Sequence, residues 1–198
     1  RYLDSEMVRD MDVLFREVGA KGIVSIDADP SIVVEVVRDA ATMLEVGDLV
    51  WEACEAEQRF GLVRDGAWFA WRYAQHPRHE YEMFVARCRT TRAPRGIALR
   101  RTGTYVVEAS LCVDWLVPIA DLAAEVSLLA ALDARTRELG LDVLLAHLPQ
   151  FDPRFLRWQR RGFLVGPPSH FLVMNSFGQH VRWLRDRWFQ TLGDSDLV

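Results

Sequence analysis

Three side chains along this sequence could transfer protons. Asp114 and Glu108 lie on one side of the apolar segment 106–116, and His147 lies near the end of the next apolar segment, 142–148. A carboxylate or a neutral imidazole beside a substrate can accept a proton as a general base, and an imidazole can also relay one. These three residues are the candidate catalytic side chains.

Each candidate also has a structural explanation. The carboxylates of Asp114 and Glu108 are suited to pairing with Arg72, Arg100 or another arginine, which is the more frequent arrangement for such residues. A histidine at the end of a buried strand is more often a hydrogen-bonded part of the core than a base. From the sequence alone both explanations stay open.

The segment 106–148 contains the elements that would position these side chains. Apolar and polar residues alternate along 106–116, which predicts a strand with one buried face. The predicted buried residues are Val107, Ala109, Leu111, Val113 and Trp115, and the predicted polar face comprises Glu108, Ser110, Cys112 and Asp114. Residues 121–139 predict a helix with Asp121 as its N-cap and Gly140 as its C-terminal glycine.

A second strand, 142–148, follows this helix directly. A strand, a helix and a strand joined by short loops predict a right-handed crossover between parallel strands. The predicted apolar stripe of the helix comprises Leu122, Val126, Leu129, Leu132 and Leu139. Because ligands collect at the carboxyl ends of such strands, with phosphate near the helix N-terminus, function is expected there.

The remaining elements are predicted from periodicity, caps and turn residues. The predicted helices are 5–18, 40–58 (with Gly47 as a point where it could divide), 68–77, a helix capped by Asp152 that ends at Gly162, and 179–188. The predicted strands are 23–26, 31–37, 81–87 and 96–100, with 163–165 and 170–177 forming a closing hairpin. Arg154, Arg157, Arg160 and Arg161 are expected on the outer side of their helix. The compact domain is expected to comprise residues 40–198, with 1–39 as an N-terminal extension or as part of the same domain.

Composition excludes several classes of function. The chain has 198 residues and a formal net charge of −4, which fits one globular domain and argues against a nucleic-acid partner. Its cysteines, Cys54, Cys88 and Cys112, have no metal-ligand spacing, so no metal site and no disulfide scaffold are expected. No apolar run reaches the length of a membrane span and no signal peptide is visible, so a cytoplasmic location is expected.

Three segments carry a resemblance to a known superfamily. They are Arg64-Asp65 followed by Trp71-Arg72-Tyr73 and His76-Pro77, the helix end Trp158-Gln159-Arg160-Arg161-Gly162-Phe163, and the tail 188–196. Together with the order of the elements, they resemble the GNAT (GCN5-related N-acetyltransferase) superfamily. Within it, they look like the GNAT-like proteins of bacterial polysaccharide-associated gene neighbourhoods. The resemblance covers about residues 40–198.

The resemblance implies an α/β fold with a mixed, mostly antiparallel sheet, helices on both faces and a central pair of parallel strands that splay apart. The pantetheine arm of acetyl-CoA or another acyl-CoA would lie between these strands, with the backbone amide near Leu116 as the oxyanion donor. The implied cofactor-binding residues are Trp115, Leu116, Val117, Asp121, Leu122, Ala123 and Ala124.

Two features depart from the superfamily pattern. The turn 117–124 contains no glycine, whereas most members have a glycine-rich turn there, and residues 152–162 contain no tyrosine that could act as an acid. The resemblance as a whole implies an acyl-CoA-dependent N-acyltransferase that acts on an amino sugar or another small amine. The alternative is a non-catalytic GNAT-like module with a degenerate CoA site. An aminoacyl-transfer relative would need a basic groove, which the net charge does not support. The acceptor, the acyl length and the oligomeric state, including a homodimer, are left open.

Overall fold

A seven-stranded mixed sheet forms the centre of the computed structural model, which describes residues 6–10, 12–57, 60–105, 107–167, 171–174 and 180–195. The strands, in spatial order, are β3 (Ile32–Val37), β4 (Glu82–Cys88), β5 (Pro94–Thr104), β6 (Glu108–Leu116), β7 (Val143–Ala146), β2 (Val13–Glu17) and β8 (Leu164–Gly166). The pair β6–β7 is parallel and every other neighbouring pair is antiparallel. The predicted fold class is confirmed.

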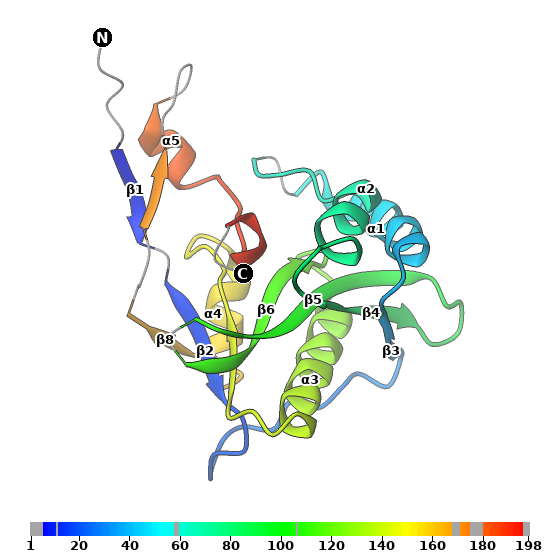
Figure 1. Cartoon of the computed structure of the whole chain (residues 1–198). Helices are drawn as coiled ribbons and strands as arrows, with labels where there is room; N and C mark the ends of the chain where they lie inside the picture. The colour runs from blue at the N-terminus through cyan, green and yellow to red at the C-terminus, as the bar shows by residue number, and fades with distance from the viewer. Residues whose placement is uncertain are drawn as a thin grey trace.

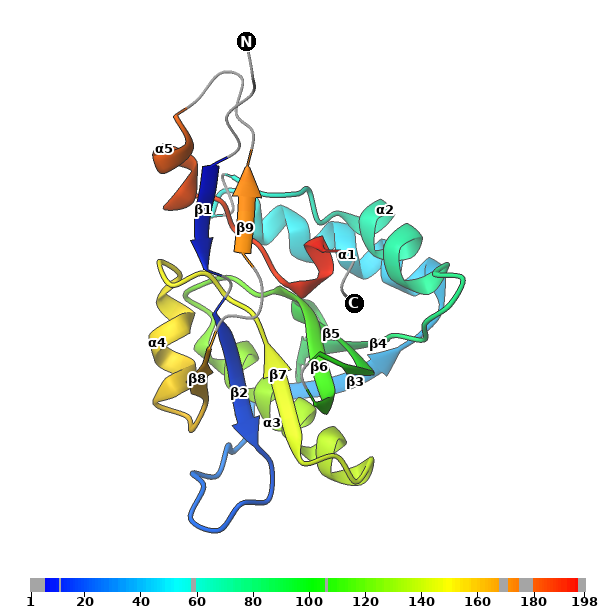
Figure 2. The same ribbon diagram turned by 60° about the vertical axis from the view of Figure 1, so that its left-hand side comes forward.

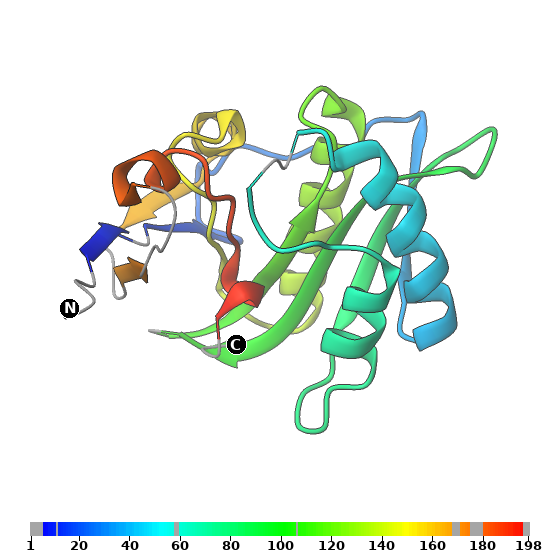
Figure 3. The same ribbon diagram turned by 90° about the horizontal axis from the view of Figure 1, so that it is seen from above.

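Helices cover both faces of this sheet (Figures 1 and 3). They are α1 (Ala40–Cys54), α2 (Gly66–Phe69), the π-helix η1 (Ala70–Ala74), α3 (Leu122–Glu138), α4 (Pro153–Gln159) and the 3₁₀ turn η2 (Leu192–Asp194). A further helix, α5 (Val181–Arg185), lies beside the N-terminal strand β1 (Glu6–Asp10), outside this sheet (Figure 1). One core layer lies under α1 and η1, and includes Val46, Tyr73 and Leu111. The other lies under α3 and α4, and includes Leu128 and Trp158.

The central strand–helix–strand unit forms as predicted, with one change in β6. A bulge places an extra residue, Val113, between the pairs Arg100–Cys112 and Leu99–Asp114. Because side chains alternate along a strand, an extra residue reverses the faces beyond it. Trp115 therefore packs on the α3 side, while Asp114 contacts Tyr73 on the α1 side. The predicted alternation holds from Ala109 to Val113 and is wrong beyond Val113. The prediction of a single buried face is wrong as well, because Ser110, Cys112 and Asp114 are buried and Val107 is exposed.

The caps of α3 also follow the sequence. Asp121 accepts a hydrogen bond from the backbone N of Ala124, and Gly140 has a φ of 68°, the left-handed conformation that glycine adopts readily. The predicted apolar stripe is partly wrong, because Leu122 and Leu139 are exposed at the two ends of the helix. Leu128, which lies outside that stripe, is fully buried instead.

The predicted helix 5–18 is wrong. Its residues form β1 (Glu6–Asp10) and β2, and positions 5 and 11 of the predicted helix lie outside the described residues. β2 is inserted between β7 and β8, and β1 pairs with β9 (Phe171–Met174) in a separate two-stranded sheet (Figure 2). Long-range pairing thus overrides a local pattern that also fits a helix.

The predicted closing hairpin is wrong for the same reason. β8 pairs with β2 and β9 pairs with β1, so the two segments join different sheets. Residues 168–170 and 175–177 of that prediction lie outside the described residues. Segment 23–26 contains no strand. Gly47 does not divide α1, which continues through it, and Gly47 packs closely against Gly66 of α2. The strands 31–37, 81–87 and 96–100 and the helix that begins after Asp152 are confirmed.

Candidate functional site

Strands β6 and β7 part where the sequence placed the candidate site. Their pairing runs from Ser110–Leu144 to Cys112–Ala146 and ends there, although β6 continues to Leu116. The bulge at Val113 begins directly beyond the last pair. Residues of β6 beyond this pair are not hydrogen-bonded to β7, and their backbone groups need other partners. This unpaired region, called the gap below, is a place where a ligand or another part of the chain can bind.

The turn that enters α3 is held by carboxylates of this chain. The backbone N of Ile119 donates to Oε2 of Glu57 at 2.7 Å, and the backbone N of Ala124 donates to Oδ1 of Asp121 at 3.0 Å. The other oxygen of Asp121 accepts a hydrogen bond from Nε of Arg95 at 2.6 Å. The helix start therefore binds anionic oxygens, as the positive end of a helix dipole favours, and here the chain itself supplies them.

Arg154 bridges the two sides of the gap. Its Nη1 donates to the carbonyl of Val117 at 2.8 Å, and its Nε and Nη2 donate to Asp152 at 2.8 and 2.6 Å. The residue is 1 % exposed, so its predicted position on the outer side of the helix is wrong. The adjacent acid explains the burial, because a buried guanidinium needs a paired carboxylate.

The C-terminal segment crosses the same region (Figure 3). The backbone N of Phe189 donates to the carbonyl of Phe60 at 2.7 Å. The guanidinium carbons of Arg64 and Arg154 lie 5.2 and 5.3 Å from the centre of the Phe189 ring, within the range of cation–π contacts. Residues 188–195 are thus fixed between the segment after α1 and the ends of the central strands.

Asp114 is the centre of a buried polar network. Its Oδ1 accepts hydrogen bonds from Nε of Arg64 at 2.8 Å and from Thr191 at 3.2 Å, and its Oδ2 accepts one from Tyr73 at 2.8 Å. Asp114 and Arg64 have no exposed surface. Burial alone would lower the pKa of Arg64, but the charges of Asp114 and Asp194 outweigh that effect and raise the pKa. The arginine partner of Asp114 is therefore Arg64 rather than Arg72 or Arg100.

Tyr73 completes this network as a donor. Burial is the main cause that raises its pKa well above the ordinary value, and the charge of Asp114 adds to it. The phenol therefore stays protonated and keeps its hydrogen bond to Oδ2 of Asp114. Trp68 adds a longer contact from Nε1 to the same oxygen, at 3.3 Å. With so many donors on both oxygens, Asp114 is arranged to hold the fold together rather than to take a substrate proton.

The three candidate catalytic residues are not gathered at one point. Glu108 is exposed at the start of β6, six residues from Asp114, or about 20 Å along the strand. His147 follows the last residue of β7 and is 3 % exposed. Its Nδ1 lies 2.7 Å from the carbonyl oxygen of Asp12. Because a carbonyl only accepts hydrogen bonds, Nδ1 carries the proton, and Nε2 is the basic nitrogen of the neutral ring.

The predicted cofactor-binding residues lie along one edge of the gap and the turn beyond it. Trp115, Leu116 and Val117 are buried at the end of β6. In the turn and the first helical residues, Asp121 and Ala123 are half-buried, Ala124 is buried and Leu122 is half exposed. The structure thus brings these residues together around the start of α3, while their contacts are made within the chain.

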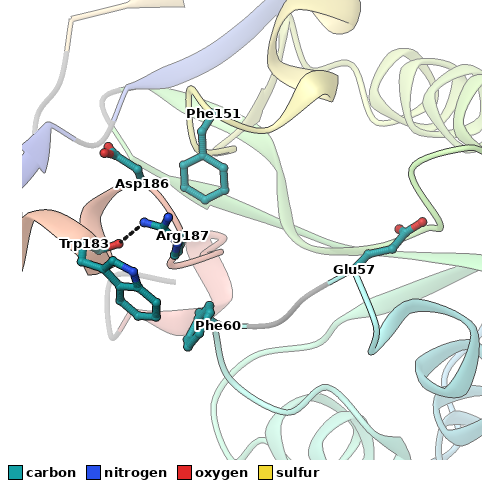
Figure 4. Close-up of a pocket in the computed structure, with 6 residues that line it drawn as sticks. All are labelled: Glu57, Phe60, Phe151, Trp183, Asp186 and Arg187. Carbon is teal, nitrogen blue, oxygen red and sulfur yellow. Dashed lines mark hydrogen bonds between the residues drawn. The ribbon is translucent and has the colours of Figure 1, made fainter. Parts of the chain in front are cut away.

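A cavity of about 570 Å³ lies beside this region (Figure 4). Its lining residues are Glu57, Phe60, Phe151, Trp183, Asp186 and Arg187. The rings of Phe60 and Trp183 meet edge to face, with 4.6 Å between their centres, and Arg187 lies over the Trp183 ring at 4.6 Å. Figure 4 shows Glu57 on the opposite side of the cavity from α5. Two carboxylates, the guanidinium of Arg187 and three aromatic rings thus line the cavity, and Arg187 covers one face of Trp183.

Sequence reasoning missed this cavity, because its residues come from three distant segments. Phe60 follows α1, Phe151 follows β7, and Trp183 and Arg187 belong to the C-terminal part. No local motif links them, and only the folded chain brings them together. Arg154 could have been suspected from its neighbour Asp152, because an aspartate two residues before an arginine can pair with it.

Two general findings hold for the described part of the chain. No group of three or more histidine, cysteine, aspartate or glutamate side chains has an arrangement that could bind a metal ion. His76 and His79 do stack, with ring centres 5.0 Å apart, but no third ligand of these types joins them. No helix there combines the length and apolar character needed to cross a membrane.

Comparison of sequences gives no relatives: neither a family model nor a curated protein matches. Comparison of structures does. A protein of unknown function from Enterococcus faecalis V583, described as a probable N-acyltransferase, matches 92 % of this chain with a TM-score of 0.63 and 11 % identity. A GCN5-related N-acetyltransferase from Anabaena variabilis matches 92 % with a TM-score of 0.58 and 12 % identity.

A functionally unknown conserved protein from Staphylococcus epidermidis matches 80 % of this chain and 59 % of its own, with a TM-score of 0.52 and 12 % identity. The Enterococcus and Anabaena proteins are larger, and this chain corresponds to 43 % of each. At these identities the likeness concerns the fold. The parallel pair within an otherwise antiparallel sheet agrees with it, and the chain therefore has the fold of the GCN5-related N-acetyltransferases.

Proposed function

We propose that this chain is an acyl-CoA-dependent N-acyltransferase that acts on a small amine. The observation that carries the proposal is the parting of β6 and β7 beyond the Cys112–Ala146 pair, next to the bulge at Val113. The GNAT resemblance implies that pantetheine lies in such a gap. Acyl-CoA would supply a thioester: the amine nitrogen would bond to its acyl carbon, the carbon–sulfur bond would break, and the proton lost by the amine would pass to the leaving CoA thiolate.

Groups of the chain itself support a cofactor at this position. The carboxylate of Glu57 on the Ile119 amide stands in for a phosphate oxygen, because both are anionic acceptors. The guanidinium of Arg154 on the Val117 carbonyl stands in for an amide N–H of pantetheine, because both are donors. Ile119 and Val117 would therefore hold the cofactor, with the charges of Arg95 and Arg157 close to the turn.

His147 is the general base in this proposal. An attacking amine must be neutral, and the bond from Nδ1 to the Asp12 carbonyl leaves Nε2 as the basic nitrogen. The residue follows directly on the last β6–β7 pair. With His147→Gln, turnover should fall about a hundredfold while CoA affinity stays unchanged. A variant that keeps normal turnover would remove the base assignment.

The acceptor in this proposal binds in the cavity of Figure 4. Glu57 and Asp186 can attract a protonated amine, and the faces of Phe60 and Trp183 can pack against a sugar ring or an alkyl chain. An amino sugar or a related amine of surface-polysaccharide synthesis is the preferred acceptor. A screen of amino sugars and of linear amines with acetyl-CoA tests this choice.

Isothermal titration with CoA and acetyl-CoA is the experiment that decides the proposal. Micromolar binding is expected for the native chain. In Glu57→Gln the competing carboxylate is gone, so binding should be at least about fivefold tighter, because a larger fraction of the protein has an accessible turn. Glu55→Gln is the matched control, an exposed glutamate at the end of the same helix, and should bind as the native chain does.

A second function, a non-catalytic GNAT-fold module, is favoured by the same internal contacts. If Glu57, Asp121 and Arg154 hold the turn and the gap permanently, no cofactor can enter. Absence of CoA binding in both the native chain and Glu57→Gln, with normal folding, would overturn the acyltransferase proposal and favour this module.

A further inference from the structure

A second cavity lies at the other end of α3, away from the gap between β6 and β7. It has a volume of about 400 Å³ and is lined near its centre by Glu82, Arg100 and Arg135. Arg135 belongs to the last turn of α3, whereas Asp121 caps its first turn. The seventeen residues of the helix span about 25 Å, so the two regions are separate sites.

Three guanidinium groups converge on the single carboxylate of Glu82. Arg100 Nη1 donates to Oε2 at 2.9 Å, Arg135 Nη2 donates to Oε1 at 2.9 Å, and Arg38 donates to Oε1 as well. One carboxylate cannot neutralise three cations. The Glu82 side chain is 10 % exposed and that of Arg100 is 5 % exposed, so both form the base of the cavity.

The rim of the cavity adds further positive charge. Arg78 is exposed, and no hydrogen bond or ion pair involves its guanidinium among the described residues. Across the whole lining, four arginines face Glu80 and Glu82, and Glu138 outside the lining pairs with Arg135, which leaves one positive charge in excess. His79 adds none near neutral pH, because burial and the nearby Arg101 and Arg78 lower its pKa. This excess stands out in a chain whose net charge is −4.

The two outer arginines have the capacity to bind a ligand. The side chain of Arg38 is 63 % exposed and uses one nitrogen on Glu82. Arg78 lies on the same rim. Guanidinium groups bind tetrahedral oxyanions with paired, charge-assisted hydrogen bonds. Arg100 and Arg135 are engaged by protein partners and would act mainly through their charge.

We infer that this cavity binds a tetrahedral oxyanion, such as a phosphate or sulfate group, held by Arg38 and Arg78 over the Glu82 cluster. The inference is independent of the proposed acyl transfer, because it uses no residue of the gap or of the cavity beside α5. The bound group can be a free ion or the anionic part of a larger molecule.

The test is a titration of the full chain with sodium phosphate, followed by NMR or calorimetry, with sodium chloride adjusted to constant ionic strength. Saturable binding is expected, and Arg38→Gln and Arg78→Gln should each weaken it about tenfold. Arg92→Gln is the matched control, because Arg92 is also exposed and pairs with a glutamate, Glu35, elsewhere on the surface. It should bind as the native chain does.

Two comparison titrations complete the test. Sodium acetate at the same ionic strength should bind more weakly than phosphate, because a planar carboxylate has fewer acceptor oxygens. A phosphate monoester, glycerol 1-phosphate, should bind at least as well as inorganic phosphate if the group of a larger molecule is the ligand. An equal response to phosphate, acetate and chloride would show screening alone and overturn the inference. Unchanged phosphate binding in both arginine variants, each verified as folded by circular dichroism, would overturn it too.

Discussion

At the scale of single residues, the hydrogen-bond partners of two buried side chains differ in kind. Asp114 has the residue type of a base, but its oxygens receive hydrogen bonds from Arg64, Tyr73 and Thr191 and have no exposed surface. His147 is also buried, yet its Nδ1 contact leaves the ring with a defined basic nitrogen. The contacts of Asp114 thus favour a structural role, whereas His147 is the residue that we propose as the base.

Asp114→Asn is expected to destabilise the chain by about 3 kcal/mol, because it removes one carboxylate from a fully buried arginine. Urea unfolding measures this change. Glu108→Gln, at an exposed position of the same strand, should change the free energy of unfolding by less than about 0.5 kcal/mol. An Asp114→Asn variant with native stability and lost turnover would instead indicate a catalytic role.

The three thiols should differ in reactivity. Hydrogen bonds from Thr91, and from the backbone at Thr90 and Thr91, lower the pKa of Cys88 to about 7. Burial raises the pKa of Cys54 to about 12, and Cys112 is shifted in the same direction. Iodoacetamide should therefore label Cys88 with a rate that rises around pH 7, measured by mass spectrometry of the folded protein. Equal labelling of all three cysteines would contradict the assignment.

At the scale of elements, a few polar residues tie distant segments together. Glu82 at the start of β4 holds Arg100 of β5, Arg135 of α3 and Arg38 between β3 and α1. Arg16 of β2 donates a hydrogen bond to Asp133 of α3 and so ties a second strand to this helix. Such contacts fix how α3 lies across the sheet, and with it the position of the candidate cofactor turn.

The contribution of Glu82 should depend on pH. Burial alone would raise its pKa, but hydrogen bonds from Arg135, Arg38 and Arg100 outweigh burial and lower it from 4.5. A carboxylate with a depressed pKa stabilises the fold above its unfolded pKa and loses this effect as pH falls through the folded pKa. Glu82→Gln should thus be less stable by about 2 kcal/mol at pH 7.

The difference between the native chain and Glu82→Gln should shrink below about pH 4.5 and vanish at lower pH. Urea unfolding of both proteins from pH 7 to pH 3 provides the measurement. Glu138→Gln is the control, because this glutamate is 64 % exposed and pairs with Arg135 alone. A pH-independent difference for Glu82→Gln would show that its charge is not what stabilises the native state.

At the scale of the whole molecule, the N-terminal segment joins the sheet. β2 lies between β7 and β8, and β3 forms the opposite edge next to β4. The predicted boundary at residue 40 stays a prediction, but these strands contribute buried residues to both core layers. This chain corresponds to 43 % of the Enterococcus protein and 43 % of the Anabaena protein, so both contain further parts outside the matched region.

Deletion of residues 1–39 is therefore expected to prevent folding. The loss of β2 would expose the edges of β7 and β8 and remove Leu14, which is fully buried, along with the Arg16–Asp133 ion pair. Circular dichroism and thermal unfolding of residues 40–198 measure the effect. A shortened chain that unfolds cooperatively at the native temperature would establish 40–198 as an independent domain.

The sequence by itself determined the elements with strong local signals. Asp121 and Gly140 set the ends of α3, Asp152 and Pro153 set the start of α4, and apolar runs set β4 to β6. These signals act within a few residues, so they are readable in one chain. Together with the resemblance to the GNAT superfamily, they predicted the fold class, which is confirmed, while the region of the candidate site stays a prediction.

Only the tertiary structure decided which strands pair and which polar groups meet. β2 resembles part of a helix in sequence and becomes a strand because β7 and β8 offer partners on both sides. Arg154, Glu57 and the cavity beside α5 enter the site from distant segments, and the bulge at Val113 changes the face on which Asp114 lies. The parallel pair β6–β7 follows from a short crossover and was predicted, but pairings between distant segments depend on contacts that local sequence patterns do not specify.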